Sequence, residues 1–249
     1  MSLFALLFLR LVVGLFAGIF GGKQGRIVGG YEARIKDFPY MVSVQVFGRH
    51  QCGGALIKPN YVVTAAHCYI PGLRYVVKAG VDDLQTEGVE SKVLEVTTHP
   101  QYNNVLLDYD VAVMKLETPL KCIPGKIQMV RLPDYSDDVP LTWGKVIGWG
   151  ETYNVKEKEN KLRALNLEVY RQEVCEDVEM FQMMDSMFCA GHFTGVKDSC
   201  NGDSGGPFVI GGTLYGVVSH GSKKCAIGFP GVYTKIPFVV NWIKEVANC

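Results

Sequence analysis

Short apolar runs recur along most of this chain, and they constrain its fold more than any other feature. Clusters of Gly, Pro, Asn and Asp, which favour turns, separate them. Short runs at close spacing predict strands, and the fold class is all-β, either a barrel or a sandwich. The predicted strands are Met41–Phe47, Ala55–Ile57, Tyr61–Thr64, Tyr75–Ala79, Val111–Leu116, Lys145–Gly150, Pro207–Ile210, Leu214–Ser219 and Gly231–Lys235.

Helical spacing is clearest at the C-terminal end of the chain. Apolar residues of Phe238–Val246 fall on one face, as expected for a helix packed against a core. A less regular helical pattern covers Glu173–Phe181. With 249 residues the chain is long enough for one all-β domain of two packed halves or for two small domains, and no internal repeat relates the halves.

The N-terminal segment is apolar from Leu3 to Phe20 except for Arg10. We assign residues 1–22 to a secretory signal peptide, although no cleavage site stands out. A signal anchor is the alternative, because the span is nearly of membrane length. A charge in the middle of a membrane span is costly, which favours the signal peptide.

Charge excludes one class of partner. The first 26 residues hold three basic residues and no acid, which leaves 22 basic against 25 acidic residues in the remainder. A net charge of −3 without a basic patch argues against nucleic-acid binding. The mixed-charge run 156–161 is typical of a solvated loop.

The eight cysteines all lie beyond residue 26, and none forms a Cys-x-x-Cys pair. An even number without metal-binding spacing indicates disulfides and therefore an oxidising, extracellular compartment. Eight cysteines allow 105 pairings, so the sequence alone does not select one.

The segment 198–207 carries the strongest sign of chemistry. Ser204 stands in a glycine-rich turn, where the N–H groups of Gly202 and Ser204 can form an oxyanion site. A serine hydroxyl needs a base, and an ordinary Gly/Ser/Asp loop has the same composition. His67 ends one apolar run and Asp110 begins another, so a base and a buried carboxylate are both available if the fold brings them together.

Taken with their flanks, these residues resemble the chymotrypsin/trypsin family of serine proteases. The resemblance runs from Ile27 to the C-terminus in the family's order of His, Asp and Ser. It implies two six-stranded antiparallel β-barrels with a C-terminal helix and a cleft between the barrels, so that residues 27–249 form the protease domain. The matching motifs are Ile27-Val-Gly-Gly30, Thr64-Ala-Ala-His-Cys68, Asp110-Val-Ala-Val113 and Gly202-Asp-Ser-Gly-Gly-Pro207.

The resemblance also implies residue roles. Ser204 is the nucleophile, His67 the general base and Asp110 the residue that orients the imidazole. The implied disulfides are Cys52–Cys68, Cys175–Cys189 and Cys200–Cys225, and elimination then pairs Cys122 with Cys249.

Substrate selection in the family depends on a pocket near the nucleophile. Asp198 resembles the aspartate at the base of the trypsin pocket, which implies cleavage after Arg or Lys. One departure is His220, which stands where the family usually has tryptophan in the substrate groove. Altered preference upstream of the cleavage site and pH dependence near neutrality are expected from it. Lys223 and Lys224 add positive charge near the pocket mouth. The predicted substrate-binding residues are Asp198, Ser199, Ser219, His220, Gly221 and Gly231.

The junction before Ile27 resembles a zymogen cleavage site. Residues 23–26 form the expected activation peptide, and a cut after Arg26 would free the Ile27 amine to pair with Asp203. Ser43 and His50 match positions that hold this aspartate in some zymogens, although both fit ordinary strand and loop roles equally well.

The segment 80–90 only partly resembles the calcium loop of vertebrate trypsins. Asp83, Glu87 and Glu90 supply carboxylates, but Val81 stands where another is expected and the loop is one residue shorter. Because calcium takes six or more oxygen ligands, we expect no tight calcium site and no cofactor.

Three hypotheses follow. The first is a secreted, zymogen-activated endopeptidase cutting after Arg or Lys; the second is a non-catalytic homologue acting as a binding module. The third is a narrow-specificity protease of a cascade or venom. The intact His67, Asp110 and Ser204 favour catalysis. The expected partners are protein or peptide substrates and protein protease inhibitors, with a monomeric mature chain that binds neither nucleic acid nor membrane.

Overall fold

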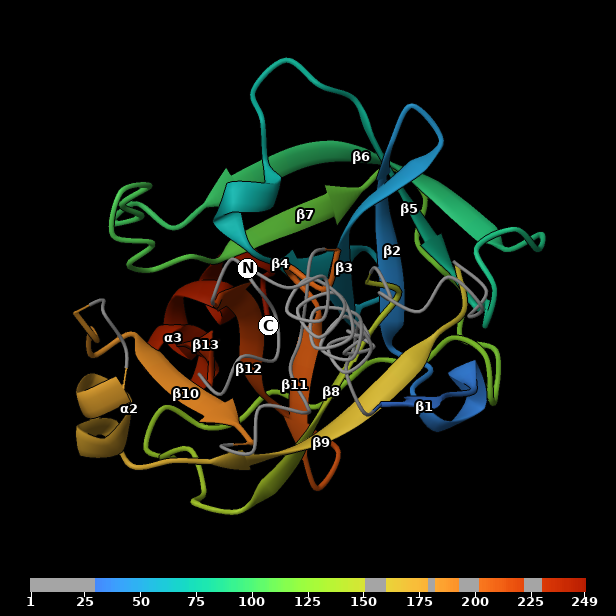
Figure 1. Ribbon diagram of the computed structural model, residues 1–249. Helices are drawn as coiled ribbons and strands as arrows, with labels where there is room; N and C mark the ends of the chain where they lie inside the picture. Colours follow the sequence, from blue (N-terminus) through green and yellow to red (C-terminus); the bar gives the residue numbers. More distant parts are fainter. Residues whose placement is uncertain (1–29, 151–159, 179–181, 193–201, 222–229) are drawn as a thin grey trace, which may run out of the picture.

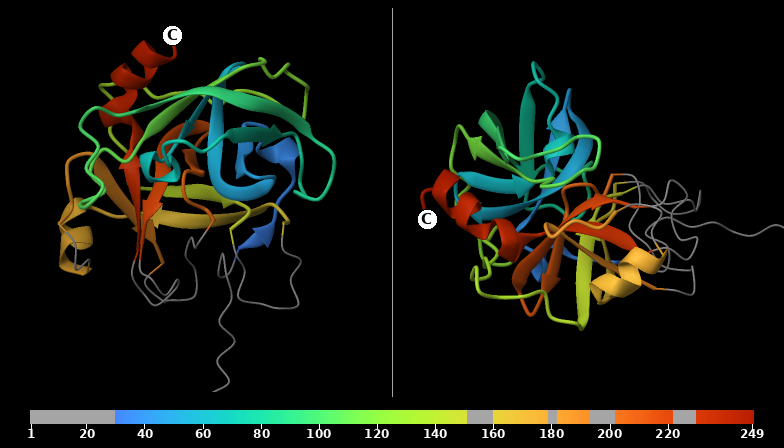
Figure 2. Two further views of the ribbon diagram at one scale, coloured as in Figure 1. Left: turned by 90° about the horizontal axis from the view of Figure 1, so that it is seen from above. Right: turned by 90° about the vertical axis from the view of Figure 1, so that its left-hand side faces the viewer.

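Two antiparallel β-barrels stand side by side and form the body of the protein (Figure 1). The structure is a computed structural model that describes residues 30–150, 160–178, 182–192, 202–221 and 230–249. The right-hand view of Figure 2 separates the first barrel, in blue to green, from the second, in yellow to red. The all-β prediction with two six-stranded barrels is therefore confirmed.

The first barrel closes in the order β2-β3-β4-β7-β6-β5, with every neighbouring pair antiparallel. All residues of β2 are buried, because its side chains alternate between the barrel interior and the surrounding structure. The strands are β2 (Met41–Val46), β3 (Arg49–Lys58), β4 (Tyr61–Thr64), β5 (Tyr75–Ala79), β6 (Val89–Thr98) and β7 (Ala112–Leu116).

The second barrel follows the order β9-β10-β13-β12-β11-β8, and the pairing of β8 with β9 closes it. Its interior packs Phe188, Phe208 and Tyr233, whose ring centroids lie 4.9 to 5.4 Å apart. The strands are β8 (Trp143–Gly148), β9 (Arg163–Val169), β10 (Met187–Gly191), β11 (Pro207–Ile210), β12 (Thr213–His220) and β13 (Gly231–Lys235).

Each end of the described chain crosses to the opposite barrel. The first strand, β1 (Tyr31–Glu32), pairs with β9 of the second barrel before the chain enters the first. The final helix, α3 (Ile236–Val246), contacts β12 of the second barrel and also meets the first barrel, where the rings of Trp242 and His99 lie 4.7 Å apart. Lys58 in the first barrel donates to the carbonyls of Ala247 and Asn248. The barrels thus exchange terminal segments.

The predicted strands all exist. Four of them match at both ends, and others have ends shifted by one or two residues, but Ala55–Ile57 is only the last part of the longer β3. β2 ends at Val46 rather than Phe47, because Phe47 and Gly48 both have positive φ and form the hairpin turn. The predictions missed β1, β6, β9 and β10. β6 contains one buried residue in ten, so its apolar pattern is weak.

Both predicted helices are present. α3 buries Val239 and Ile243 from the predicted face, and Trp242 and Val246 pack against the same core. The shorter helix, α2, spans Gln172–Val178, and the end of its predicted range lies outside the described residues. Short 3₁₀ turns cover Ile35–Asp37 and Ala66–Cys68. In the described part of the chain, no helix combines the length and apolar character needed to cross a bilayer.

Two of the expected disulfides are present, Cys52–Cys68 and Cys175–Cys189. The first ties β3 to the turn that carries His67. The pairing of Cys122 with Cys249 was wrong for this structure, in which both are exposed free cysteines. Elimination failed because an even number of cysteines carries no information on which of them lie close together. The expected Cys200–Cys225 bridge lies outside the described residues.

Candidate active site

The pairing of two strands explains why His67 and Asp110 meet. β4 and β7 are antiparallel neighbours in which Thr64 faces Ala112. His67 follows Thr64 by three residues and Asp110 precedes Ala112 by two, so both lie beyond the same end of the strand pair. Residues 43 positions apart in sequence are thereby brought into contact.

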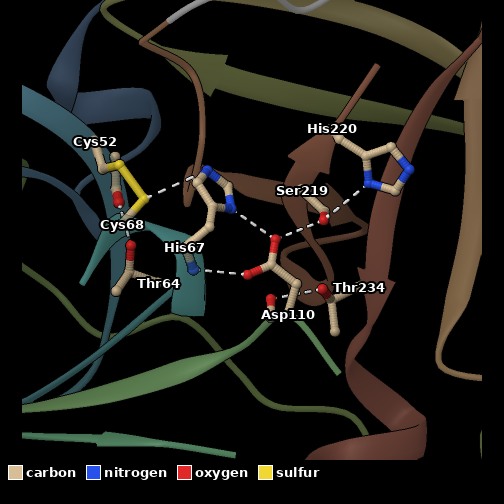
Figure 3. A network of polar contacts seen from close by, with 9 residues as sticks. Cys52, Thr64, His67, Cys68, Asp110, Ser219, His220 and Thr234 are labelled. Carbon is tan, nitrogen blue, oxygen red and sulfur yellow. Dashed lines mark hydrogen bonds and ion pairs between the residues drawn. A yellow bond between two sulfur atoms is a disulfide. The ribbon is translucent and has the colours of Figure 1, made fainter. Parts of the chain in front are cut away.

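Asp110 is fully buried and accepts hydrogen bonds on both carboxylate oxygens (Figure 3). Oδ2 lies 2.7 Å from Nδ1 of His67, and Oδ1 accepts the His67 backbone N–H at 2.9 Å. Ser219 Oγ donates to Oδ2 at 2.6 Å. Because Nδ1 of His67 donates to a carboxylate, Nε2 is the nitrogen that can take up a proton.

The backbone of this region is held from the second barrel, by residues that the sequence did not single out. Thr234 Oγ1 donates to the Asp110 carbonyl oxygen at 2.7 Å. The N–H of Tyr109 bonds to Ser186 Oγ at 3.2 Å, and Ser186 Oγ donates in turn to Asp108. Tyr109 has a φ of 50°, a conformation that is uncommon for a non-glycine residue and that these bonds help to maintain.

The turn containing Ser204 packs against the first barrel. Gly53 in β3 donates its N–H to the Ser204 carbonyl at 2.8 Å, and the Gly53 carbonyl accepts from Thr64 Oγ1 at 2.8 Å. Thr64 is three residues before His67, so two hydrogen bonds connect the Ser204 backbone to the base of the His67 turn.

Gly205 makes this close approach possible. Its φ is 76°, and a Cβ placed on it would overlap Thr64 Oγ1 and lie 2.6 Å from the Gly53 carbonyl oxygen. Only glycine satisfies both the backbone conformation and the space. The glycine-rich character of the predicted nucleophile turn is thus explained by contact between the barrels.

The end of β12 provides the other predicted substrate-binding residues within the described chain. Ser219 is buried, His220 is half-buried, and Ser219 Oγ lies 3.1 Å from His220 Nδ1. A Cβ added to Gly221 would lie 3.7 Å from the Cα of Gly231, so these two glycines face each other. Ser219, predicted to bind substrate, is therefore also a direct partner of Asp110.

Asp203 is fully buried next to Ser204, and its Oδ1 accepts the N–H of Gly150 at 3.0 Å.

His50 contacts the backbone of the Ser204 turn at Gly202. Its Nε2 lies 2.9 Å from the Gly202 carbonyl and its Nδ1 lies 2.8 Å from Ser43 Oγ. A carbonyl only accepts, so Nε2 donates to Gly202 and Ser43 donates to Nδ1. Burial lowers the pKa of the His50 ring.

Several predicted residues lie outside the described residues, and nothing in the structure bears on them. Asp198 and Ser199 of the predicted pocket are among them, as are Lys223 and Lys224. The same holds for the predicted activation residues Arg26 and Ile27.

Two lysine side chains contact oxygens of the 80–90 loop. Lys78 Nζ, on a side chain only 11% exposed, donates to the Leu84 carbonyl at 3.1 Å and lies 3.7 Å from Glu90 Oε1. Asp83 already pairs with Lys161 at 3.2 Å. Both contacts bring positive charge to oxygens that a cation could otherwise use.

The fold holds His67 against the buried Asp110 and places the Ser204 turn against the same barrel, which is typical of serine hydrolases. Comparison with known proteins identifies the family within this class. A family model described as Trypsin matches residues 27–243. The chain is 39% identical to Trypsin 5G1 of Aedes aegypti over 91% of this chain and 86% of that protein. It is 39% identical to Trypsin-2 of Salmo salar over 90% and 96%, respectively. Trypsin V-B of Rattus norvegicus is 38% identical over 90% of each chain. The chain belongs to the trypsin family and is a serine endopeptidase that acts on protein substrates.

Proposed function

We propose that this chain is a secreted endopeptidase, activated by a cut after Arg26, that hydrolyses peptide bonds after Arg or Lys. The observation that carries the proposal is the contact of His67 with the buried Asp110 beside the Ser204 turn. Secretion is supported by the apolar N-terminal segment and by the disulfides.

In this mechanism Ser204 Oγ attacks the carbonyl carbon of the substrate and His67 Nε2 takes the hydroxyl proton. His67 then passes that proton to the leaving amine, and an acyl–Ser204 ester remains. Water hydrolyses the ester by the same sequence of proton transfers. Asp110 holds the imidazole in the Nδ1–H tautomer and stabilises the imidazolium cation.

The N–H groups of Gly202 and Ser204 stabilise the oxyanion of the tetrahedral intermediate. Loss of one such donor typically costs about 3 kcal/mol of transition-state stabilisation.

Selection of Arg and Lys rests on Asp198, whose carboxylate would meet a basic side chain at the base of the pocket. The neighbouring Ser199 would complete the pocket floor, and Gly221 and Gly231 would leave the pocket wall without side chains. His220 replaces a large flat ring in the adjoining groove and alters the preference for upstream substrate residues.

The experiment is to cleave the recombinant chain after Arg26 and to compare esters of Arg, Lys, Phe and Leu. Arg and Lys esters should be hydrolysed fastest, and Ser204→Ala should lower kcat by more than about 10⁴-fold. Turnover that does not depend on Ser204 eliminates the proposal in favour of a binding module. Preference for Phe esters eliminates the role of Asp198.

Activity and stability should not depend on calcium, because Lys78 supplies the cation of the 80–90 loop. Thermal unfolding midpoints in millimolar calcium and in excess chelator should coincide. A midpoint that rises with calcium would show that the loop binds the ion.

A further inference from the structure

His220 reaches the hydrogen-bond network of Asp110 from the side opposite His67. Its Nδ1 lies 3.1 Å from Ser219 Oγ, and that oxygen lies 2.6 Å from Asp110 Oδ2. The same Oδ2 lies 2.7 Å from His67 Nδ1. Figure 3 shows the result, in which two imidazole rings stand at the ends of one hydrogen-bonded series.

The direction of each hydrogen bond in this series follows from the chemistry of the groups. A carboxylate only accepts, so the single hydroxyl proton of Ser219 points at Asp110. Ser219 has no second proton to offer, and its oxygen must therefore accept from His220. The Nδ1 atom of His220 carries a proton, and this ring has the Nδ1–H tautomer.

We propose that His220 is a positioning residue for the His67–Asp110 pair, because its Nδ1–H group polarises the Ser219 hydroxyl toward Asp110. A more strongly donating hydroxyl takes up part of the carboxylate charge. Asp110 then stabilises the imidazolium form of His67 less, and Nε2 of His67 stays unprotonated, and able to act as base, at lower pH. The inference rests on the proposed catalytic roles of His67 and Asp110.

The surroundings of His220 agree with a neutral donor. Burial lowers the pKa of the His220 ring, Asp110 opposes this effect, and the charge of His67 adds to it. Among the described residues, His67 and Asp110 are titratable groups that act on the ring. A ring with a lowered pKa remains neutral near pH 7 and retains the single proton that Ser219 accepts.

Substitutions at position 220 distinguish the effect of the hydrogen-bond donor from the effect of the ring itself. His220→Phe keeps a flat ring and removes the donor, so the pKa of His67 should rise by about half a unit. His220→Asn places an amide N–H₂ close to the position of Nδ1 and should leave the pKa of His67 near its original value. His220→Leu is a second donor-free variant in case the phenylalanine does not fold.

The measurement is an NMR titration of the His67 ring in the Ser204→Ala background, where no turnover is needed. The acid limb of kcat/KM against pH in the active enzyme should move by the same amount. With Ser219→Ala also present, His220→Phe should have no further effect, because the intermediate hydroxyl is missing.

Three results would overturn the inference: equal His67 pKa values in all position-220 variants, an asparagine variant that behaves like phenylalanine, or a phenylalanine shift that persists without Ser219. Thermal midpoints identify variants that fail to fold. An active chain with no shift rejects the role of His220 alone, whereas an inactive parent enzyme rejects the proposed function and leaves the NMR test intact.

Discussion

Side-chain hydrogen bonds hold the His67–Asp110 region in place, whereas backbone contacts hold the Ser204 turn. Asp110 takes its partners from both barrels, and each partner donates through a polar atom. The Ser204 turn instead meets the first barrel through the Gly53 amide and through the space left by Gly205. The His67–Asp110 region therefore depends on the polar groups of its side chains, and the Ser204 turn depends on the lack of a side chain at Gly205.

The largest effect should come from removing the charge of Asp110. Asp110→Asn offers His67 an amide and favours the wrong imidazole tautomer. We expect kcat to fall about 10⁴-fold, the loss known for the equivalent change in the type enzymes of this family. Ser219→Ala removes one donor and keeps the carboxylate, so its loss should stay within about 10-fold. A loss in Asp110→Asn as small as that in Ser219→Ala contradicts this account.

The packing of the Ser204 turn against the first barrel should be lost when a single methyl group is added. Gly205→Ala forces a positive φ and an overlap with Thr64, and should destabilise the fold by about 3 kcal/mol or more. Gly48 is the matched control, because its φ is also positive but nothing lies within 4 Å of an added Cβ. Gly48→Ala should cost about 1 kcal/mol. Urea denaturation of both variants in the Ser204→Ala background measures the difference, and equal costs would show that contact between the barrels is unimportant.

A site remote from both regions gives a reference for a buried charge. Lys78→Met removes an ammonium that is bonded to the Leu84 carbonyl and should cost about 2 kcal/mol of unfolding free energy. Lys92→Met removes an exposed ammonium 3.9 Å from Glu117 and should change stability by less than about 0.5 kcal/mol. Chemical denaturation at pH 7 compares the two. Similar values for both variants would mean that the 80–90 loop does not need its internal cation.

The smallest expected effect is the pH dependence of the unfolding free energy that His50 contributes. Burial lowers the pKa of His50, which joins Ser43 to the Gly202 carbonyl. The unfolded chain binds a proton near pH 6.5 while the folded chain does not, so stability from this ring is present above that pH. It is lost as pH falls below 6.5 toward the lowered pKa. Unfolding free energies at pH 8, 6.5 and 5 should show a smaller decline in His50→Gln than in the parent, and an unchanged decline contradicts the assignment.

Much of this arrangement could be predicted, because short apolar runs report directly on barrel strands. The motifs around His67 and Asp110 identified two residues that the fold brings into contact. The motif around Ser204 identified the turn that accepts a hydrogen bond from Gly53. β9 is a strand that the sequence could have predicted. Apolar and polar residues alternate from Leu165 to Val169, which is typical of a half-buried strand, but a prediction based on uninterrupted apolar runs overlooked them.

Contacts between distant segments were beyond prediction. Thr234 and Ser186 support the Asp110 region through single hydroxyl groups, and nothing in their own sequence neighbourhoods indicates that role. The direction of the His220 hydrogen bond needs the positions of Ser219 and Asp110 together. Cys122 and Cys249 show the opposite case, in which counting suggested a bond that the fold does not make.

The exchange of terminal segments between the barrels makes the two halves of the chain interdependent. Fragments divided between β7 and β8 would each lack a segment that covers them in the intact chain: the N-terminal fragment would expose the surface packed by α3, and the C-terminal fragment would lose the β1 neighbour of β9. Each fragment carries the segment that the other lacks. Mixed together, the halves should recognise each other through these complementary segments, and reassociation would restore the hydrogen bonds that join Asp110 to Ser219 and Gly53 to Ser204.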